Sequence, residues 1–257
     1  MNSESPAFPG DLDPGRMPAH VAMIMDGNGR WARKRLMNRV RGHRRGAEVV
    51  RSMVRACGDL GIAHLTLYAF STENWSRPRT EVSALMGILK NFLRSELPEM
   101  LEKGIRLSVL GQMERLPADV GTLLRDTMIR TAEGRRMTLN LALSYGGRAE
   151  ILEAVRALAG KARDGLDPEA IDEEMVAAHL FTRNLPDPDL LIRTSGEQRI
   201  SNFLLWQIAY AELFFTETLW PDFTREELIA ILKAYQGRNR RFGALDAAEA
   251  SPAPESD

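Results

Sequence analysis

The stretch that decides the fold reads His20-Val21-Ala22-Met23-Ile24-Met25-Asp26-Gly27-Asn28-Gly29-Arg30-Trp31. Its first half, residues 21–25, has the length and the aliphatic composition of a buried strand. The strand pattern ends at Asp26 and Gly27, where two nearby glycines let backbone N–H groups approach an anion and Arg30 adds a planar fork of donors. A buried strand followed by such a loop favours phosphate binding on an α/β fold.

Strand and helix patterns alternate along the rest of the chain. We expect further strands at 65–70, 105–110, 137–143 and 190–193, and helices at 47–60, 82–102, 118–132 and 149–159. This alternation predicts a mainly parallel central sheet flanked by helices, with the ligand site at the carboxyl ends of the strands.

Composition indicates one catalytic domain. A chain of 257 residues with 44% hydrophobic content can bury one large core, and 34 Lys and Arg against 35 Asp and Glu exclude a histone-like protein. The first 16 residues lack the apolar segment of a signal peptide, and the apolar stretch 203–215 is too short to span a membrane. Together with the single cysteine, Cys57, this predicts a cytoplasmic protein. We expect residues 1–16 and 244–257 to be disordered tails.

A strongly basic segment follows the glycine loop. Eight Lys and Arg side chains lie between Arg30 and Arg45, with His43 and no acidic residue, and we expect Arg39 and His43 to face the same anion site.

Two alternative functions stay open. The glycines and Ala32 match the dinucleotide fingerprint G-x-G-x-x-A, although the apolar helix and the ribose-binding acid of that motif are missing. Basic runs also bind nucleic acid, but the near-zero net charge argues against a nucleic-acid partner.

Two later loops carry similar chemistry. The loop Ser71-Thr72-Glu73-Asn74-Trp75-Ser76-Arg77-Pro78 follows a predicted strand, and residues 193–201 place two arginines and several hydroxyls beyond another. Helix capping explains Ser71 or Thr72, but it does not require Trp75 and Arg77. Two anion sites predict two phosphorylated substrates.

The possible metal chemistry is narrow. The four histidines have no Cys or His partners at zinc spacing, so a zinc site is not expected. Carboxylates such as Asp26 and Glu212 favour Mg²⁺ bridging a diphosphate, because this ion takes few protein ligands. The chain has neither a Walker lysine loop nor the adjacent aspartate pair of trans-prenyltransferases, which excludes both chemistries.

Three parts of the chain resemble the cis-prenyltransferases, the family of the bacterial undecaprenyl diphosphate synthases. They are residues 20–32 with Gly42-His43, residues 68–75, and residues 189–212. The likeness runs from about Pro18 to Gly243, which implies a catalytic domain of residues 17–243 that encloses a hydrophobic tunnel.

The resemblance also implies an activity. It is the sequential cis-condensation of isopentenyl diphosphate with farnesyl diphosphate, giving a long-chain polyprenyl diphosphate, with undecaprenyl diphosphate expected, as the lipid carrier precursor for cell-wall synthesis. Mg²⁺ as cofactor, a homodimer, and a peripheral position at the inner membrane face are implied as well. A cis-prenyltransferase of different product length remains an alternative.

Site roles follow from the same resemblance. Asp26 would be the essential catalytic acid and, with Glu212, a magnesium ligand, while Asn74 would be the proton acceptor. The residues expected to bind the two substrates are Gly27, Asn28, Gly29, Arg30, Trp31, Arg39, His43, Ser71, Thr72, Glu73, Trp75, Arg77, Arg193, Arg199, Ile200 and Ser201. Arg241-Phe242-Gly243 would reach the neighbouring subunit. The expected tunnel walls are Leu85, Met86, Leu89, Phe92, Leu93, Leu139 and Leu141, with Met137 at the closed end.

Overall fold

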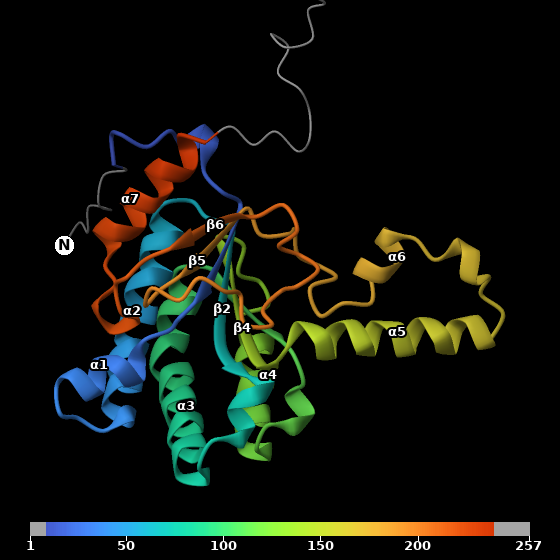
Figure 1. Ribbon diagram of the computed structural model, residues 1–257, viewed down its shortest axis with the longest axis horizontal. Helices are drawn as coiled ribbons and strands as arrows, with labels where there is room; N and C mark the ends of the chain where they lie inside the picture. Colours follow the sequence, from blue (N-terminus) through green and yellow to red (C-terminus); the bar gives the residue numbers. More distant parts are fainter. Residues whose placement is uncertain (1–8, 239–257) are drawn as a thin grey trace, which may run out of the picture.

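A parallel sheet forms the centre of the molecule (Figure 1), and the computed structural model describes residues 9–238 of the chain. The six strands run in the order β3-β4-β2-β1-β5-β6, and every neighbouring pair is parallel. Their bounds are β1 His20–Ile24, β2 His64–Ser71, β3 Ile105–Leu110, β4 Met137–Tyr145, β5 Leu190–Arg193 and β6 Glu212–Phe215. The predicted single α/β domain with a mainly parallel sheet is confirmed.

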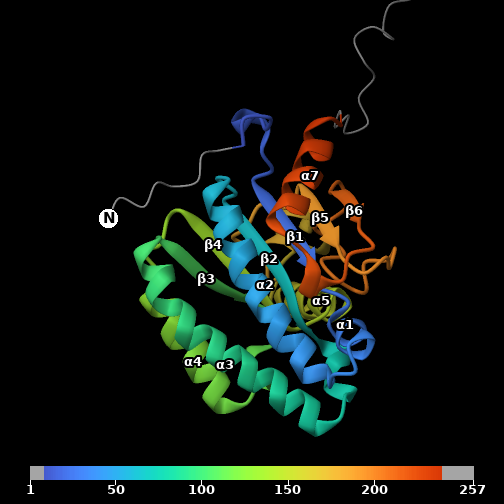
Figure 2. The same cartoon turned by 90° about the vertical axis from the view of Figure 1, so that its left-hand side faces the viewer.

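The helices form one thick layer and one projecting arm. Their bounds are α1 Asn28–Lys34, α2 Arg39–Asp59, α3 Arg79–Glu102, α4 Ala118–Arg130, α5 Gly147–Arg163, α6 Glu173–Ala177 and α7 Arg225–Gln236. Short 3-10 turns include η1 Pro14–Arg16, η2 Thr72–Ser76 and η5 Trp220–Asp222. Side chains from α2, α3, α4 and α7 share one hydrophobic core with the sheet, and α2, α3 and α4 lie over that face in Figure 2.

The position of strand β1 in the sheet explains why residues 21–24 are all apolar. Val21 and Met23 belong to the core beneath the helices, whereas Ala22 and Ile24 belong to a second core on the other face. Successive side chains of a strand point to opposite faces, so a central strand buried on both sides needs apolar residues at every position. Strand β1 is buried along its whole length.

The sheet gathers the polar loops at one edge. Strands β2, β1 and β5 are neighbours and parallel, so the loops that follow them leave the sheet at the same edge. These loops lead to η2, to α1 and to residues 194–202, respectively. The three polar loops therefore lie beside one another at the carboxyl ends of the strands, where the sequence predicts the ligand site.

A glycine lets α2 lie against the first loop. A Cβ atom added at Gly42 would come within 2.1 Å of the backbone oxygen of Asn28, so no larger residue fits there. Helix α2 starts at Arg39, where the Asn38 side chain caps it by accepting a hydrogen bond from the backbone N–H of Arg41 at 3.0 Å. This contact brings the first turns of α2, with His43, beside the glycine loop.

The arm of α5 and α6 projects from the body (Figure 1), and a buried carboxyl group fastens its base. Glu150 is 1% exposed and accepts hydrogen bonds from the Tyr145 hydroxyl, from the Phe181 backbone N–H and from Gln207. Burial raises the pKa of Glu150 although these donors favour its charged form. Farther along α5, the apolar side chains of Leu152 and Val155 are about half exposed.

The N-terminal segment before β1 packs on α7. The predicted N-terminal tail ended at Arg16, but Leu12 is buried and the Asp13 backbone N–H donates to the Gln236 side chain at 3.0 Å, which fixes this segment on α7. The disorder expected for residues 9–16 is therefore wrong, because Leu12 supplies a core contact. Residues 1–8, the tail 244–257 and the motif 241–243 lie outside the described residues. Within residues 9–238 no helix is long and apolar enough to cross a membrane.

Candidate active site

Asp26 stands at the centre of the site. Its Oδ2 atom accepts hydrogen bonds from Arg193 Nη2 at 2.9 Å and from Arg30 Nη2 at 3.2 Å, and its Oδ1 accepts from the Gly27 N–H at 2.6 Å. Gly27 makes this turn in the left-handed region, with φ of 107°. Burial opposes ionisation of Asp26, but the hydrogen bonds and positive charges of Arg193 and Arg30 outweigh it and hold the pKa of Asp26 below its usual value. At neutral pH the group is therefore a carboxylate.

Arg193 organises the loop after β5. Its side chain is 4% exposed, and Nη1 donates to the Ser201 hydroxyl at 2.7 Å and to the backbone oxygen of Arg199. Its Nε atom is buried and has no acceptor among the described residues. A buried donor without a partner is costly, so an anionic ligand oxygen that accepted from this group would be favoured.

The loop after β5 also positions the side chains of Arg30 and Arg199. Glu197 pairs with Arg30 at 3.0 Å and with Arg199. Ser195 and Ser201 adopt left-handed backbone angles, with φ of 84° and 48°. Such angles are unfavourable for residues other than glycine, which marks a segment whose shape is imposed by its contacts.

A polar pocket of about 600 Å³ opens beside Asp26. Its walls are the loop of residues 25–30, the connection between α1 and α2, and the side chains of Arg39, His43, Arg77 and Glu81. The expected anion-binding residues of the glycine loop, α2 and the η2 loop thus meet around one space.

Glu81 lies among the cations of this pocket. Its carboxylate is 3.1 Å from Arg77, 3.7 Å from Arg39 and 3.9 Å from His43 Nε2. Burial and the positive charge of Arg77 lower the pKa of His43 to about 4, although Glu81 acts in the opposite direction. His43 is consequently neutral at pH 7, and the two arginines carry the positive charge.

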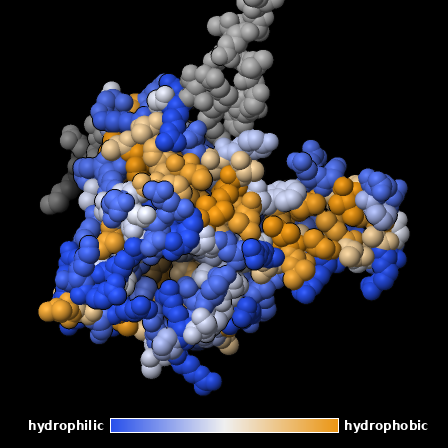
Figure 3. Space-filling model, viewed as in Figure 1, coloured by the Kyte–Doolittle hydropathy of each residue, from blue (hydrophilic) through white to orange (hydrophobic). Residues whose placement is uncertain are grey.

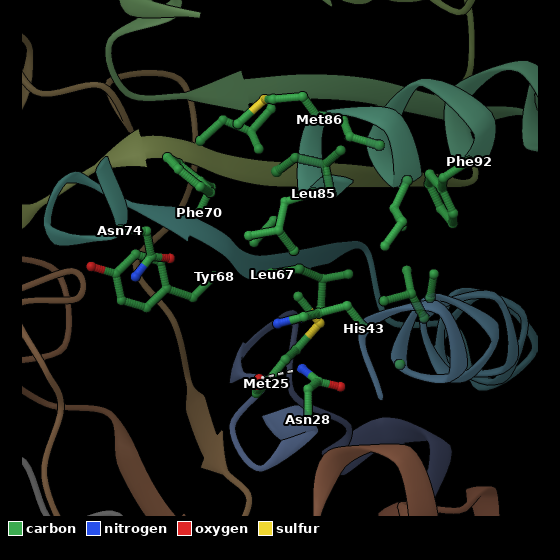
Figure 4. A pocket seen from close by; sticks show the side chains of 18 of the residues that line it. Met25, Asn28, His43, Leu67, Tyr68, Phe70, Asn74, Leu85, Met86 and Phe92 are labelled. Atoms are coloured by element: carbon green, nitrogen blue, oxygen red, sulfur yellow. Dashed lines mark hydrogen bonds between the residues drawn. The ribbon is translucent and has the colours of Figure 1, made fainter. Parts of the chain in front are cut away.

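An apolar cavity of about 180 Å³ adjoins the polar pocket, and the two share Met25, Asn28, His43 and Arg77. Helices α2 and α3 and strands β2 and β4 line it with aliphatic and aromatic side chains. Figure 4 shows Asn74 and Tyr68 at one end of this cavity and Phe92 at the other.

Several expected tunnel residues lie outside this cavity. Leu85, Met86, Leu89, Phe92 and Leu141 line it. Leu93, Met137 and Leu139 are at most 2% exposed and belong to the core beyond it. The apolar cavity described above therefore does not reach Met137.

Side-chain hydrogen bonds fix the η2 loop. Asn74 Oδ1 accepts from the Ser71 backbone N–H at 3.2 Å in a capping box. Trp75 Nε1 donates to the Ser144 hydroxyl at 2.9 Å. A third bond runs from Asn202 to Glu73 at 2.9 Å and joins this loop to the loop after β5.

Several residues expected at the substrates line neither cavity, namely Trp31, Ser71, Thr72, Glu73, Trp75, Arg193, Arg199, Ile200 and Ser201. Three of them have clear structural roles in the loops. Trp31 lies outside both cavities and donates from Nε1 to Asp222 at 2.7 Å. Ile200 packs against the second core, and Thr72 lies close to Gly146. These three side chains support the loops and do not face either cavity.

Glu212 is separated from Asp26 within one chain. It is in register with Leu190 of β5, which is in register with Val21 of β1. Val21 precedes the end of β1 at Ile24 by three positions, so Glu212 lies about 10 Å back from that end along the strand direction at 3.3 Å per residue, and two strands to the side. Glu212 pairs instead with Arg238. Within one chain the register therefore sets Glu212 apart from Asp26 along the sheet.

Sequence reasoning also missed functional neighbours. Glu81 was not singled out, although it follows Arg77 by four residues at the start of a helix, a spacing that predicts an ion pair. Glu197 lay in the quoted motif without an assigned role. Ser144, the acceptor for Trp75, gave no local signal because it comes from β4.

The residues present fit a magnesium ion only if substrate supplies most of its ligands. No group of three His, Cys, Asp or Glu side chains among residues 9–238 could hold a metal by itself. The ionised Asp26 beside a pocket rich in anion-binding groups suits Mg²⁺, which keeps water and phosphate oxygens as ligands.

Fold and site together define an α/β protein in which a pocket rich in cationic side chains adjoins an apolar cavity. A family model described as "Putative undecaprenyl diphosphate synthase" matches residues 24–243. An isoprenyl transferase of Heliobacterium mobile is 49% identical over 245 residues, covering 95% of this chain and 94% of that protein. One from Staphylococcus haemolyticus is 49% identical over 236 residues, covering 91% and 92%. The chain belongs to the undecaprenyl diphosphate synthase family and is a prenyltransferase.

Solved structures agree with this membership. The lavandulyl diphosphate synthase of Lavandula x intermedia, solved with dimethylallyl diphosphate, has a TM-score of 0.87 and 39% identity, over 89% of this chain and 99% of that one. A probable undecaprenyl diphosphate synthase of Campylobacter jejuni has a TM-score of 0.73 and 33% identity, over 88% and 98%. Because the chain is a prenyltransferase, the dinucleotide-dependent oxidoreductase alternative is wrong.

Proposed function

We propose that this prenyltransferase condenses isopentenyl diphosphate sequentially with farnesyl diphosphate and forms cis double bonds in a long-chain polyprenyl diphosphate. The observation that carries the proposal is the contact between the polar pocket and the apolar cavity, which share His43 and Arg77. A prenyl diphosphate has the same division into an anionic head and an apolar tail. At about 0.8 kcal/mol per buried CH₂, each added five-carbon unit contributes several kcal/mol to retention of the growing chain.

The glycine loop, Arg39 and Arg77 bind the allylic diphosphate in this proposal. When the allylic C–O bond breaks, its electron pair leaves with the diphosphate, and negative charge grows on the departing oxygens. Arginines and backbone N–H groups fixed at that place stabilise the transition state more than the ground state. Glu81 holds Arg77 and Arg39 in position before the substrate arrives.

Isopentenyl diphosphate binds to Arg193, Arg199 and Ser201. Arg193 supports this assignment because its Nε donor is unpaired and Ser201 is already oriented by its Nη1. The isopentenyl double bond attacks the allylic carbon and forms the new C–C bond. The resulting cation then loses a proton, which leaves the new double bond. Asn74, a neutral amide, is a weak base, so a diphosphate oxygen or a water accepts the proton beside it.

Mg²⁺ is the proposed cofactor, with Asp26 as its protein ligand and substrate oxygens as most of the others. When bound, it neutralises charge on the departing diphosphate. Asp26 keeps its negative charge at working pH because Arg193 and Arg30 hold its pKa low.

The assay that tests the reaction uses labelled isopentenyl diphosphate with farnesyl diphosphate and Mg²⁺. We expect label to become extractable into butanol, EDTA to stop this, and Asp26→Ala to abolish it without loss of the folded circular-dichroism spectrum. Absence of lipid product from the wild-type protein, or product formation unaffected by EDTA, would contradict the proposal.

A homodimer is the proposed assembly. Leu152 and Val155 leave an apolar surface on the projecting α5 (Figure 3), and Leu213 and Phe215 are partly exposed on the edge strand β6. Exposed apolar patches of this kind favour protein–protein contact. Glu212 also belongs to β6, so a second chain offers a way for this carboxylate to approach an Asp26.

Subunit mixing tests that arrangement. Two inactive variants, Asp26→Ala and Glu212→Ala, are combined by refolding or coexpression. If Glu212 acts across the interface, each mixed dimer contains one site with both carboxylates intact and keeps about half of wild-type activity, so a randomly assorted 1:1 mixture should reach about a quarter. If Glu212→Ala alone is fully active, or if the mixed dimers stay inactive, its action across the interface is excluded.

The cellular setting follows from the product. A long polyprenyl chain is insoluble in water, so a cytoplasmic enzyme must hand it to a lipid phase. We therefore propose a peripheral position at the inner membrane face, where the product serves as a lipid carrier precursor for the cell wall.

A further inference from the structure

The connection between α1 and α2 carries an unusual leucine. Leu36 is 99% exposed, and the neighbouring Met37 is 39% exposed. Leu36 also adopts the left-handed region, with φ of 54°. Both features are unfavourable for a leucine in water, and no contact within the described chain offsets them. An outlier of this kind is a reason to look for a partner outside the chain.

Cations surround this side chain. Arg33 and Lys34 form the last turn of α1, while Arg41 and Arg44 lie three residues apart on one face of α2. All four are exposed, and none forms an ion pair with another residue of the described range. No acidic residue lies between positions 30 and 45 to neutralise them.

The surface view shows the same arrangement. In Figure 3 a small apolar spot stands at the lower left edge, over the connection between α1 and α2, with hydrophilic surface around it. An aliphatic tip within a basic surface is complementary to an anionic bilayer, where acyl chains lie beneath negatively charged head groups. Nucleic acid offers the negative charge but no aliphatic layer for a leucine.

The connection also stands at the rim of the candidate site. Leu36 and Met37 belong to the lining of the polar pocket, together with Asp26 and Arg39. A surface that touches this connection therefore lies next to the opening through which a diphosphate head group enters or leaves.

We infer that the connection between α1 and α2 docks the protein on an anionic lipid bilayer. Leu36 enters the acyl region, and Arg33, Lys34, Arg41 and Arg44 contact the head groups. The inference rests on the proposed function for its purpose, since it assigns a surface to the membrane contact proposed above. Burial of one leucine side chain corresponds to roughly a tenfold change in partitioning. Each Lys or Arg near an anionic surface corresponds to about fivefold.

Vesicle sedimentation of the full chain tests the inference. Vesicles of phosphatidylcholine with phosphatidylglycerol should bind the wild-type protein at near-physiological salt, and vesicles of phosphatidylcholine alone should not. Leu36→Gly should weaken binding about tenfold while the melting temperature stays equal or rises, because glycine accepts the positive φ without strain. The pair Arg33→Gln and Lys34→Gln should weaken it about fivefold per charge removed.

Matched controls come from distant exposed positions. Ile129, 75% exposed on α4, is changed to Ser, and Arg163, with its side chain 82% exposed on α5, is changed to Gln. Both should bind vesicles as wild type does. Equal weakening by these controls, unchanged binding of Leu36→Gly, or equal binding to neutral vesicles would overturn the inference.

Two further arms separate other ligands. Saturating pyrophosphate should leave vesicle binding intact, whereas displacement would show that head groups occupy the diphosphate pocket and would overturn the inference. Retention of RNA that depends on Arg33 and Lys34 but not on Leu36, without vesicle binding, would do the same. An active enzyme that ignores vesicles would refute only the docking surface. An inactive protein that binds them through Leu36 would refute only the proposed reaction.

Discussion

Arg193 donates from Nη2 to Oδ2 of Asp26 over 2.9 Å and so joins the loops that follow two neighbouring strands. The same guanidinium contacts Ser201 and the backbone of Arg199. Lysine keeps the charge but cannot reach these partners together. We expect Arg193→Lys to lower kcat roughly a hundredfold or more, by comparison with the loss of one fixed donor at a developing anion.

Steady-state kinetics with a thermal melt checks that expectation. Arg51→Lys is the matched control, because Arg51 pairs with Glu96 at 2.6 Å away from the site and should leave kcat unchanged. A fully active Arg193→Lys variant would show that the planar contacts of Arg193 are not required.

Acid should destabilise the protein through His43. Burial and Arg77 lower the pKa of this imidazole from 6.5 to about 4, and its side chain is 17% exposed. Because the folded-state pKa lies below the unfolded one, the unfolded chain binds more protons between pH 6.5 and 4, and stability falls as the pH drops through that window. The loss approaches about 3 kcal/mol at the acidic end.

Urea titrations at a series of pH values measure this effect. His43→Gln should flatten the pH dependence by that amount, and the remaining slope should include His20, whose pKa burial also lowers to about 4. An unchanged slope in His43→Gln would contradict the assignment of a neutral imidazole.

Removing the charge of Glu81 should strengthen anion binding. Its carboxylate forms ion pairs with Arg77 and Arg39 in the polar pocket, so it competes with an incoming diphosphate for these two side chains. We expect Glu81→Gln to bind inorganic pyrophosphate about tenfold more tightly in calorimetry. Glu96→Gln is the control, since Glu96 is equally 12% exposed and pairs with Arg51 outside the site. Weaker binding by Glu81→Gln would mean that its positioning of the arginines dominates.

Product length should depend on Phe92 more than on Met137. Phe92 ends the cavity on the side away from Asn74, whereas Met137 lies in the core beyond it. Phe92→Ala should let further isoprene units enter and should lengthen the products. Met137→Ala should leave the length unchanged and lower stability by about 2 to 5 kcal/mol.

Chromatography of the dephosphorylated products beside thermal melts distinguishes these outcomes. Leu93→Ala is a further control, because Leu93 is fully buried next to Phe92 but outside the cavity. Longer products from Met137→Ala with unchanged products from Phe92→Ala would restore Met137 as the closed end.

The parts of the fold that the sequence predicts are those governed by local pattern. An uninterrupted apolar run at 21–25 is sufficient for a strand buried on both faces, and the polar residues after it mark the ligand edge. Strand β6 was missed because it lies inside a longer apolar stretch and alternates only over four residues. The early start of α2 at Arg39 was missed because its first turns are basic, and their helix depends on the Asn38 cap and on contact at Gly42.

Within the site, motifs identified residues but could not supply their register. Asp26, Arg193 and Ser201 do meet, as neighbouring loops of a parallel sheet should. Glu212 belongs to the same quoted stretch as Arg193, yet strand pairing places it level with Val21. Such an offset is decided by hydrogen bonding between strands distant in sequence, which no local pattern records.

Helix α2 contributes to both cavities along one stripe. Arg39 and His43 border the polar pocket, and Ala47 and Val50 border the apolar one. At 1.5 Å per residue, the stripe spans about 16 Å. The helix therefore sets a fixed distance between the side chains of the polar pocket and those of the apolar cavity. Substitutions at Ala47 or Val50 can change the apolar cavity without disturbing the polar pocket. One inserted residue would instead rotate the later residues by about 100° and turn them away from the cavity.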